Sequence, residues 1–96
     1  MINHYEGSNF EEFIQDRILV DFYANWCGPC KMLSSVLEKV SNEIKILKVN
    51  VDENQDLARE YGVMSIPCVI LFDKGKEIKR NVGFVPEGKL REFIKN

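Results

Sequence analysis

Three nearly continuous runs of apolar residues cross the chain, and each has the composition of a buried β-strand. They cover residues 17–24, 45–51 and 68–72. Runs that are apolar on both faces are typical of the central strands of a parallel or mixed sheet. Two weaker strands are expected at residues 2–5 and 77–82, and the second of these alternates like a half-exposed edge strand.

Between these runs, apolar residues recur at the spacing of an α-helix. The clearest helix follows a pair of cysteines and has Pro29 in its first turn, where a missing N–H group costs little. Its apolar stripe consists of Met32, Leu33, Val36, Leu37, Val40 and Ile44. A short helix is expected over about residues 8–15, because Ser8 and Glu11 match the capping-box pattern.

Two further helices complete the predicted order of elements. Asn54 is expected to cap a short helix that runs through Tyr61 and ends at Gly62. A closing helix is indicated by the apolar stripe of Leu90, Phe93 and Ile94. The turn at residues 73–76 joins two strands directly, which indicates one antiparallel pair, whereas strands joined through helices are parallel neighbours. We therefore predict an α/β fold, a three-layer sandwich of helices around a mixed central β-sheet, in one domain over residues 1–96.

The charge balance excludes several classes of function. The chain carries 13 basic and 15 acidic side chains, a net charge of −2, and no run of like charge exceeds two residues. Binding of nucleic acid through a cationic face is therefore not expected, nor is an electrostatic membrane anchor. No apolar run approaches the about 20 residues of a membrane span, and the first residues lack the pattern of a secretory signal. We expect a cytoplasmic protein, in a compartment where thiols are held reduced.

The chemistry of the chain is expected at Cys27 and Cys30, where a buried strand gives way to a helix. Free N–H groups and the positive end of the helix dipole favour a thiolate there, so the pKa of Cys27 should be low. Cys30 lies one helical turn further on, close enough for a disulfide to form and break without unfolding. Gly28 lets another chain approach, Pro29 stiffens the segment, and Trp26 can cover one side of the sulfur.

A zinc half-site is the alternative interpretation of two cysteines at this spacing. Such a site needs two more ligands, and only Cys68 and His4 remain among the cysteines and histidines of the chain. Three cysteines also cannot all pair within one chain, so a framework of structural disulfides is a poor interpretation. We therefore predict a redox-active pair and no metal site.

Asp21 interrupts the first buried run, six residues before Cys27. A carboxylate among apolar neighbours is costly unless it is paired or used in the chemistry of a site. Burial should raise its pKa and make it a proton acceptor for Cys30, directly or through water. The alternative is that strand alternation turns Asp21 toward solvent.

The segments WCGPC at residues 26–30, LVDFYA at residues 19–24 and SIPC at residues 65–68, together with the order of elements, resemble the thioredoxin family. The resemblance covers essentially the whole chain and implies a protein-disulfide reductase, an enzyme and electron carrier of cell redox homeostasis. It implies that Cys27 attacks a client disulfide, that Cys30 resolves the mixed disulfide, and that a thioredoxin reductase recycles the oxidised pair. It also implies a monomer with no bound cofactor beyond the redox-active disulfide Cys27–Cys30.

The resemblance assigns supporting roles to further residues. It places Lys48 near Asp21, and it implies a cis peptide bond before Pro67 that faces the cysteine pair. The exposed backbone of Ile66 would then pair with an extended client segment, as in strand addition. Gly83 would keep the docking groove shallow. The resulting apolar rim around Cys27 is expected to consist of Trp26, Gly62, Ile66, Pro67 and Gly83.

Cys68 departs from the family pattern, which usually has Thr at this position. It is interpreted as a small buried residue that begins a core strand. The alternative is a third thiol close enough to Cys30 to form another bridge or to help hold a soft metal.

Two other functions remain open at the level of sequence. The fold can serve as a binding module whose thiols are incidental. An oxidase or isomerase of the same fold is the other possibility, although the Gly28–Pro29 pair favours a reductant.

Overall fold

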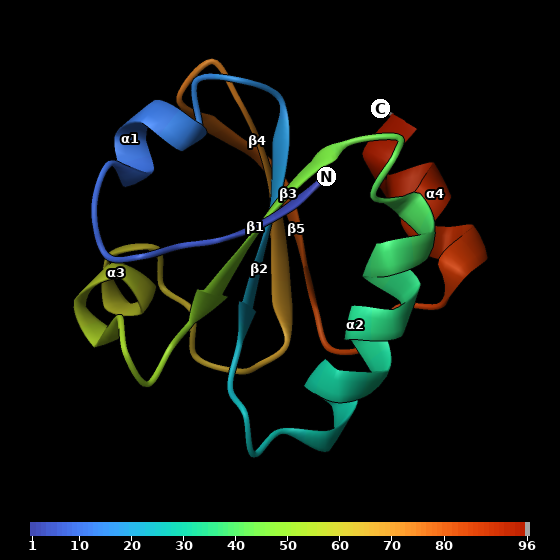
Figure 1. Ribbon diagram of the computed structural model, residues 1–96, viewed down its shortest axis with the longest axis horizontal. Helices are drawn as coiled ribbons and strands as arrows, with labels where there is room; N and C mark the ends of the chain where they lie inside the picture. Colours follow the sequence, from blue (N-terminus) through green and yellow to red (C-terminus); the bar gives the residue numbers. More distant parts are fainter. Residues whose placement is uncertain (96) are drawn as a thin grey trace.

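A computed structural model describes residues 1–95, and Figure 1 shows its helices and strands. The strands are β1 (Ile2–His4), β2 (Ile18–Tyr23), β3 (Lys45–Asn50), β4 (Cys68–Asp73) and β5 (Lys76–Val82). The helices are α1 (Phe10–Phe13), α2 (Gly28–Val40), α3 (Gln55–Glu60) and α4 (Glu87–Lys95). This confirms the predicted order of elements.

The five strands form one mixed sheet in the order β1-β3-β2-β4-β5. The pairs β1–β3 and β2–β3 are parallel, and β2–β4 and β4–β5 are antiparallel. Helices α1 and α3 cover one face of the sheet, while α2 and α4 cover the other (Figure 1). The predicted three-layer α/β sandwich is therefore confirmed.

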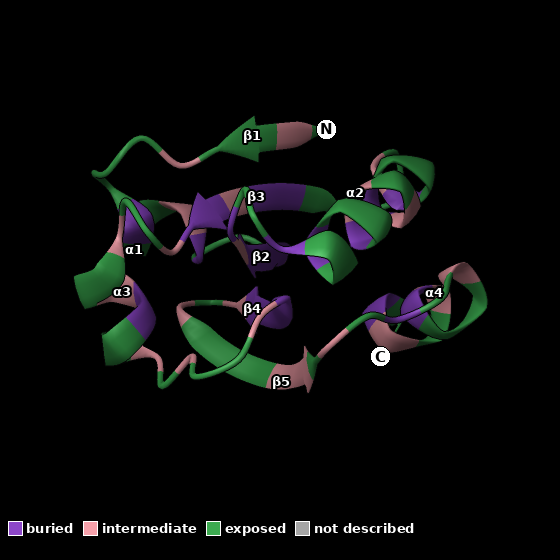
Figure 2. Cartoon of the chain, turned by 90° about the horizontal axis from the view of Figure 1, so that it is seen from below, coloured by how far each residue is buried: buried purple, intermediate pink, exposed green. Residues whose placement is uncertain are grey.

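The core has two halves, one on each face of the sheet. Figure 2 shows that the buried residues gather in the central strands and on the sheet-facing sides of the helices. Successive side chains of β2 alternate between the faces: Val20 and Phe22 pack with α1 and α3, while Leu19 packs with α2 and α4. Asp21 follows the same alternation and therefore points to the face that carries α2.

Two local expectations are wrong at helix starts. Helix α1 begins after Asn9, whose backbone is left-handed (φ 65°). The Asn9 side chain does not cap the helix, and because the N-cap is Asn9, the capping box of Ser8 and Glu11 does not form. Asn54 does precede α3, but its side-chain amide donates to the carbonyl oxygen of Asn50 instead of capping the helix.

The apolar stripe predicted for α2 differs from the structure at Met32 and at Ile44, which lies beyond the end of the helix at Val40. The side chain of Met32 points to solvent and is 59% exposed, whereas Leu33, Leu37 and Val40 are buried. No helix within residues 1–95 has the length and apolar character needed to cross a membrane.

Candidate active site

Cys27 and Cys30 form a disulfide at the start of α2, with their Cα atoms 5.2 Å apart. Cys27 is the N-cap residue, with an extended backbone, and Pro29 lies in the first turn as predicted. The N–H group of Cys30 donates to the Sγ of Cys27 over 3.2 Å. The first turn of the helix therefore offers one of its free N–H groups to the sulfur, an arrangement that favours negative charge on that atom.

Apolar residues enclose both sulfurs. Cys27 is 5% exposed and Cys30 is 2% exposed. They form a cluster with Ala24, and the partly buried Tyr23, Val51 and Ile66 pack against it. Since Gly28 and Pro29 between them are exposed, the segment reaches the surface while its sulfurs stay largely covered.

The peptide bond between Ile66 and Pro67 is cis. The N–H group of Gly83 donates to the carbonyl oxygen of Pro67 over 2.7 Å, which joins the end of β5 to this segment. Gly83 has a φ of 96°, in the left-handed region that side chains rarely adopt. Ile66, Pro67 and Gly83 thus form one connected stretch, and Ile66 brings it against the cysteines.

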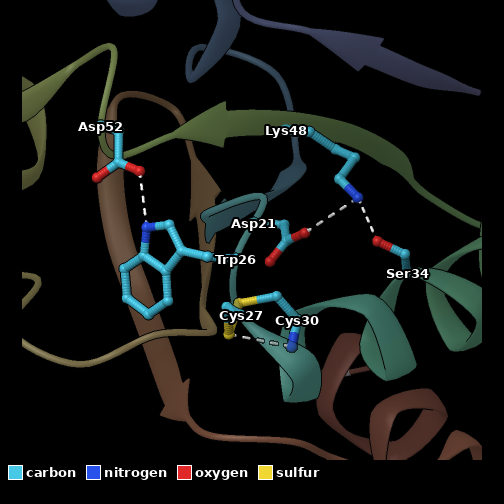
Figure 3. The surroundings of a disulfide bond; sticks show 7 residues. All are labelled: Asp21, Trp26, Cys27, Cys30, Ser34, Lys48 and Asp52. Atoms are coloured by element: carbon cyan, nitrogen blue, oxygen red, sulfur yellow. Dashed lines mark hydrogen bonds and ion pairs between the residues drawn. A yellow bond between two sulfur atoms is a disulfide. The ribbon is translucent and has the colours of Figure 1, made fainter.

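Trp26 is 71% exposed, and its indole Nε1 donates to the carboxylate of Asp52 over 2.8 Å. Figure 3 shows the ring beside Asp52. Sequence reasoning missed Asp52. The signal that could have found it is topological: Trp26 and Asp52 both follow the carboxyl ends of the adjacent parallel strands β2 and β3, which share one edge of the sheet.

Gly62 lies in a different part of the site from the disulfide. It has a φ of 65° and lines a surface pocket of about 570 Å³. Val51, Asp52 and the 95% exposed Met64 line the same pocket. The pocket therefore adjoins the Trp26 side of the cysteine segment, because Asp52 belongs to both.

Asp21 is fully buried, which rules out the solvent-facing alternative. No described residue donates a hydrogen bond to either of its carboxylate oxygens. The nearest cation is the ammonium of Lys48, 3.7 Å from Oδ2. Burial raises the pKa of Asp21 from 3.8 to about 6, and the charge of Lys48 acts in the opposite direction.

Lys48 lies opposite Asp21 in the register of β2 and β3. Its side chain is 11% exposed, and its ammonium donates to the hydroxyl of Ser34 on α2 (Figure 3). The same ammonium sits 4.7 Å from the ring centre of Tyr23. Sequence reasoning expected Lys48 here but missed Ser34, which lies one helical turn after Cys30 and so faces the same side of α2.

Among residues 1–95, no group of three or more His, Cys, Asp or Glu side chains is arranged to hold a metal ion. Cys68 is a free, buried cysteine at the start of β4, and burial raises the pKa of its thiol. It packs in the half of the core that contains Phe22 and Phe72, apart from the cluster around Cys27.

Comparison with known proteins agrees with this geometry. The family model described as Thioredoxin matches residues 1–96. A thioredoxin of Bacillus subtilis is 47% identical over 81 residues, which is 80% of this chain and 78% of that protein. A thioredoxin of Chlamydia caviae is 45% identical and covers 98% of this chain and 96% of its own.

A solved structure of a mutant thioredoxin from Halobacterium salinarum superimposes with a TM-score of 0.92 at 36% identity, over 98% of this chain and 88% of that one. The fold, the cysteine pair at the helix start and these similarities agree. The chain belongs to the thioredoxin family and is a disulfide oxidoreductase that acts by thiol–disulfide exchange through Cys27 and Cys30.

Proposed function

We propose that the chain reduces disulfides of client proteins in the cytoplasm as a monomer, and that a thioredoxin reductase returns its own disulfide to the dithiol. The observation that carries this proposal is the position of Cys27 at the N-cap of α2, with the Cys30 N–H group directed at its sulfur. A dithiol that donates electrons also suits a compartment that keeps thiols reduced.

In the first step, the thiolate of Cys27 attacks one sulfur of the client disulfide. A Cys27–client disulfide forms, the client S–S bond breaks, and the second client sulfur leaves as a thiolate that takes up a proton. In the second step, the thiolate of Cys30 attacks the Sγ of Cys27. The Cys27–Cys30 disulfide forms and the remaining client sulfur leaves, so that two electrons have passed to the client.

Asp21 is proposed as the acceptor of the Cys30 proton before the second step. Its carboxylate is buried behind the cysteine pair, and a pKa of about 6 lets it be ionised at neutral pH while it stays a stronger base than an exposed carboxylate. Lys48 would moderate that basicity through its charge, 3.7 Å away.

The client segment is proposed to dock across the exposed edge of the site. Ile66 contacts the cysteine cluster and is partly exposed, so its backbone would pair with an extended client strand. Pro67 and Gly83 would shape the floor of this groove, while Trp26 and Gly62 would flank it on the side of Asp52. Gly28 and Pro29 leave the approach to Cys27 open.

Reduction of insulin disulfides, with dithiothreitol as the electron source, tests the proposed activity. The chain should accelerate insulin precipitation well above the rate with dithiothreitol alone, and the Cys27→Ser variant should not. A rate equal to that of dithiothreitol alone would contradict the proposal. A binding module whose thiols are incidental would also show only the rate of dithiothreitol alone. Its Cys27→Ser variant would still bind the partner.

A further inference from the structure

The ammonium of Lys48 lies near two oxygen acceptors but donates a hydrogen bond to only one of them. It donates a hydrogen bond to the hydroxyl of Ser34. Its distance to the Asp21 carboxylate is 3.7 Å, beyond the about 3.2 Å limit of a good N–H···O bond. The carboxylate, although buried, is left without a donor from the described residues. Figure 3 shows these three side chains converging from α2, β3 and β2.

We propose that Ser34 is a positioning residue, whose hydroxyl holds the Lys48 ammonium short of a direct hydrogen bond to Asp21. This inference rests on the proposed role of Asp21 as the proton acceptor. A partly buried ammonium and a buried carboxylate attract each other strongly, so an unopposed Lys48 would close the remaining gap. The hydroxyl on α2 provides the competing acceptor.

The other surroundings of the ammonium also favour a position away from Asp21. The ring of Tyr23 lies 4.7 Å away and offers its face to the cation. Ser34, Lys48, Tyr23 and Cys30 all line a surface pocket of about 260 Å³. The hydroxyl therefore holds the ammonium toward this pocket and away from the interior position of Asp21.

Among the charged and titratable groups around Asp21, Lys48 has the largest effect on its carboxylate. Lys48 on β3 is the cation within 4.0 Å of its carboxylate in the described chain. The charge of Asp21 also acts on Tyr23 of β2 and Cys68 of β4. The Cys27–Cys30 pair packs with Tyr23, and His4 and Lys31 line the pocket beside Lys48. None of these supplies a second cation to the carboxylate at that distance.

Removal of the hydroxyl should therefore make Asp21 a weaker base. If the ammonium moves from 3.7 Å to about 2.9 Å from the carboxylate, Coulomb's law at an effective dielectric constant of about 20 lowers the titration midpoint by roughly one pH unit. The acid limb of the pH profile for the attack of Cys30 on the mixed disulfide should move down by the same amount.

The test is a carboxyl ¹³C NMR titration of Asp21 in the oxidised chain, with its signal assigned by its loss in Asp21→Asn. Ser34→Ala should titrate roughly one pH unit below the unmodified chain. Ser34→Thr keeps the hydroxyl and should restore the original midpoint. Ser35→Ala is the matched control, because Ser35 is the next residue of α2 and is exposed. Its midpoint should not change.

A second comparison shows whether Ser34 acts through Lys48. In the Lys48→Met background, the further change Ser34→Ala should leave the midpoint where Lys48→Met put it. The inference is overturned if Ser34→Ala titrates like the Ser35→Ala control, shifts upward, or still shifts without Lys48.

The proposed role of Asp21 as the proton acceptor is tested by a separate measurement. If Asp21→Asn leaves the pH profile of mixed-disulfide resolution unchanged, then Asp21 is not the proton acceptor. A midpoint shift in Ser34→Ala would in that case still establish the positioning of Lys48.

Discussion

The carboxylate of Asp21 lies 3.7 Å from the ammonium of Lys48, yet neither of its oxygens accepts a hydrogen bond from a described residue. Most buried carboxylates are paired or hydrogen-bonded, because an uncompensated buried charge costs several kcal/mol. Here the attraction offsets only part of that cost, and the pKa of Asp21 rises to about 6. The site therefore holds a carboxylate of raised pKa at a cost in stability, and that cost can be measured.

The Asp21→Asn variant should be more stable than the unmodified chain at neutral pH and lose this advantage in acid. The pKa of Asp21 is about 6 in the folded chain against 3.8 ordinarily, so the unfolded chain gives up this proton at lower pH than the folded one. Stability therefore falls as pH rises through that window and stays low above it. The advantage of the variant should grow by about 2–3 kcal/mol from pH 4 to pH 8.

Urea unfolding of the oxidised proteins at several pH values measures this difference. Asp56→Asn is the matched control, because it removes the charge of an aspartate whose side chain is fully exposed. A constant difference between Asp21→Asn and the unmodified chain at all pH values would contradict a raised pKa.

The Cys30→Ser variant should accumulate a covalent complex with its client. Cys27 can still attack a client disulfide, but without a thiol at position 30 nothing on the chain releases the product. Incubation with insulin should therefore give a mixed-disulfide species on non-reducing gels that dithiothreitol removes. The Cys27→Ser variant should give no such species. A complex formed equally by both variants would show that Cys27 is not the attacking thiol.

Most of the fold followed from the sequence because its signals are local and strong. The three apolar runs became β2, β3 and β4, and the spacing of Leu33 and Leu37 defined the buried side of α2. The helix starts were less predictable. The pattern at Ser8 and Glu11 suits a capping box, but the chain enters α1 through the left-handed Asn9. Tertiary contacts decide that entry, and no short pattern encodes them.

The site was predictable only in part. The cysteines and Asp21 carry chemistry that their positions along the chain already suggest. Ser34 and Asp52 can be recognised as site residues only in the folded structure, where Ser34 contacts Lys48 and Asp52 contacts Trp26. A serine within a helix and an aspartate after a strand are too common to stand out.

The Asp52→Ala variant should free the indole of Trp26 without harming the fold. The hydrogen bond between them is exposed, so its loss should change the free energy of unfolding by less than about 1 kcal/mol. The chain has a single tryptophan, so its fluorescence reports this ring alone. Fluorescence anisotropy of Trp26 should fall as the ring gains freedom, and Asp56→Ala should leave it unchanged. An unchanged anisotropy in Asp52→Ala would show that the carboxylate does not restrain the ring.

Cys68 should take no part in the exchange. It is 1% exposed, and burial raises the pKa of its thiol, so thiolate is scarce there at neutral pH. After mild oxidation, peptide mapping by mass spectrometry should find Cys27–Cys30 as the only bridge. Iodoacetamide should then label no cysteine in the folded chain and Cys68 alone after unfolding. A bridge between Cys68 and Cys30, or labelling of Cys68 in the folded chain, would contradict this.

Strand β2 has its two neighbours at very different points along the chain: Lys48 lies beside Asp21 on β3, and Val69 lies beside it on β4. The cysteine segment is therefore synthesised before β4, the strand that closes the sheet around Asp21. Before β4 is made, the thiols have neither the Ile66–Pro67 segment beside them nor a fully buried Asp21 carboxylate behind them. The environment of the cysteine pair is therefore complete only after the Ile66–Pro67 segment and β4 have been translated.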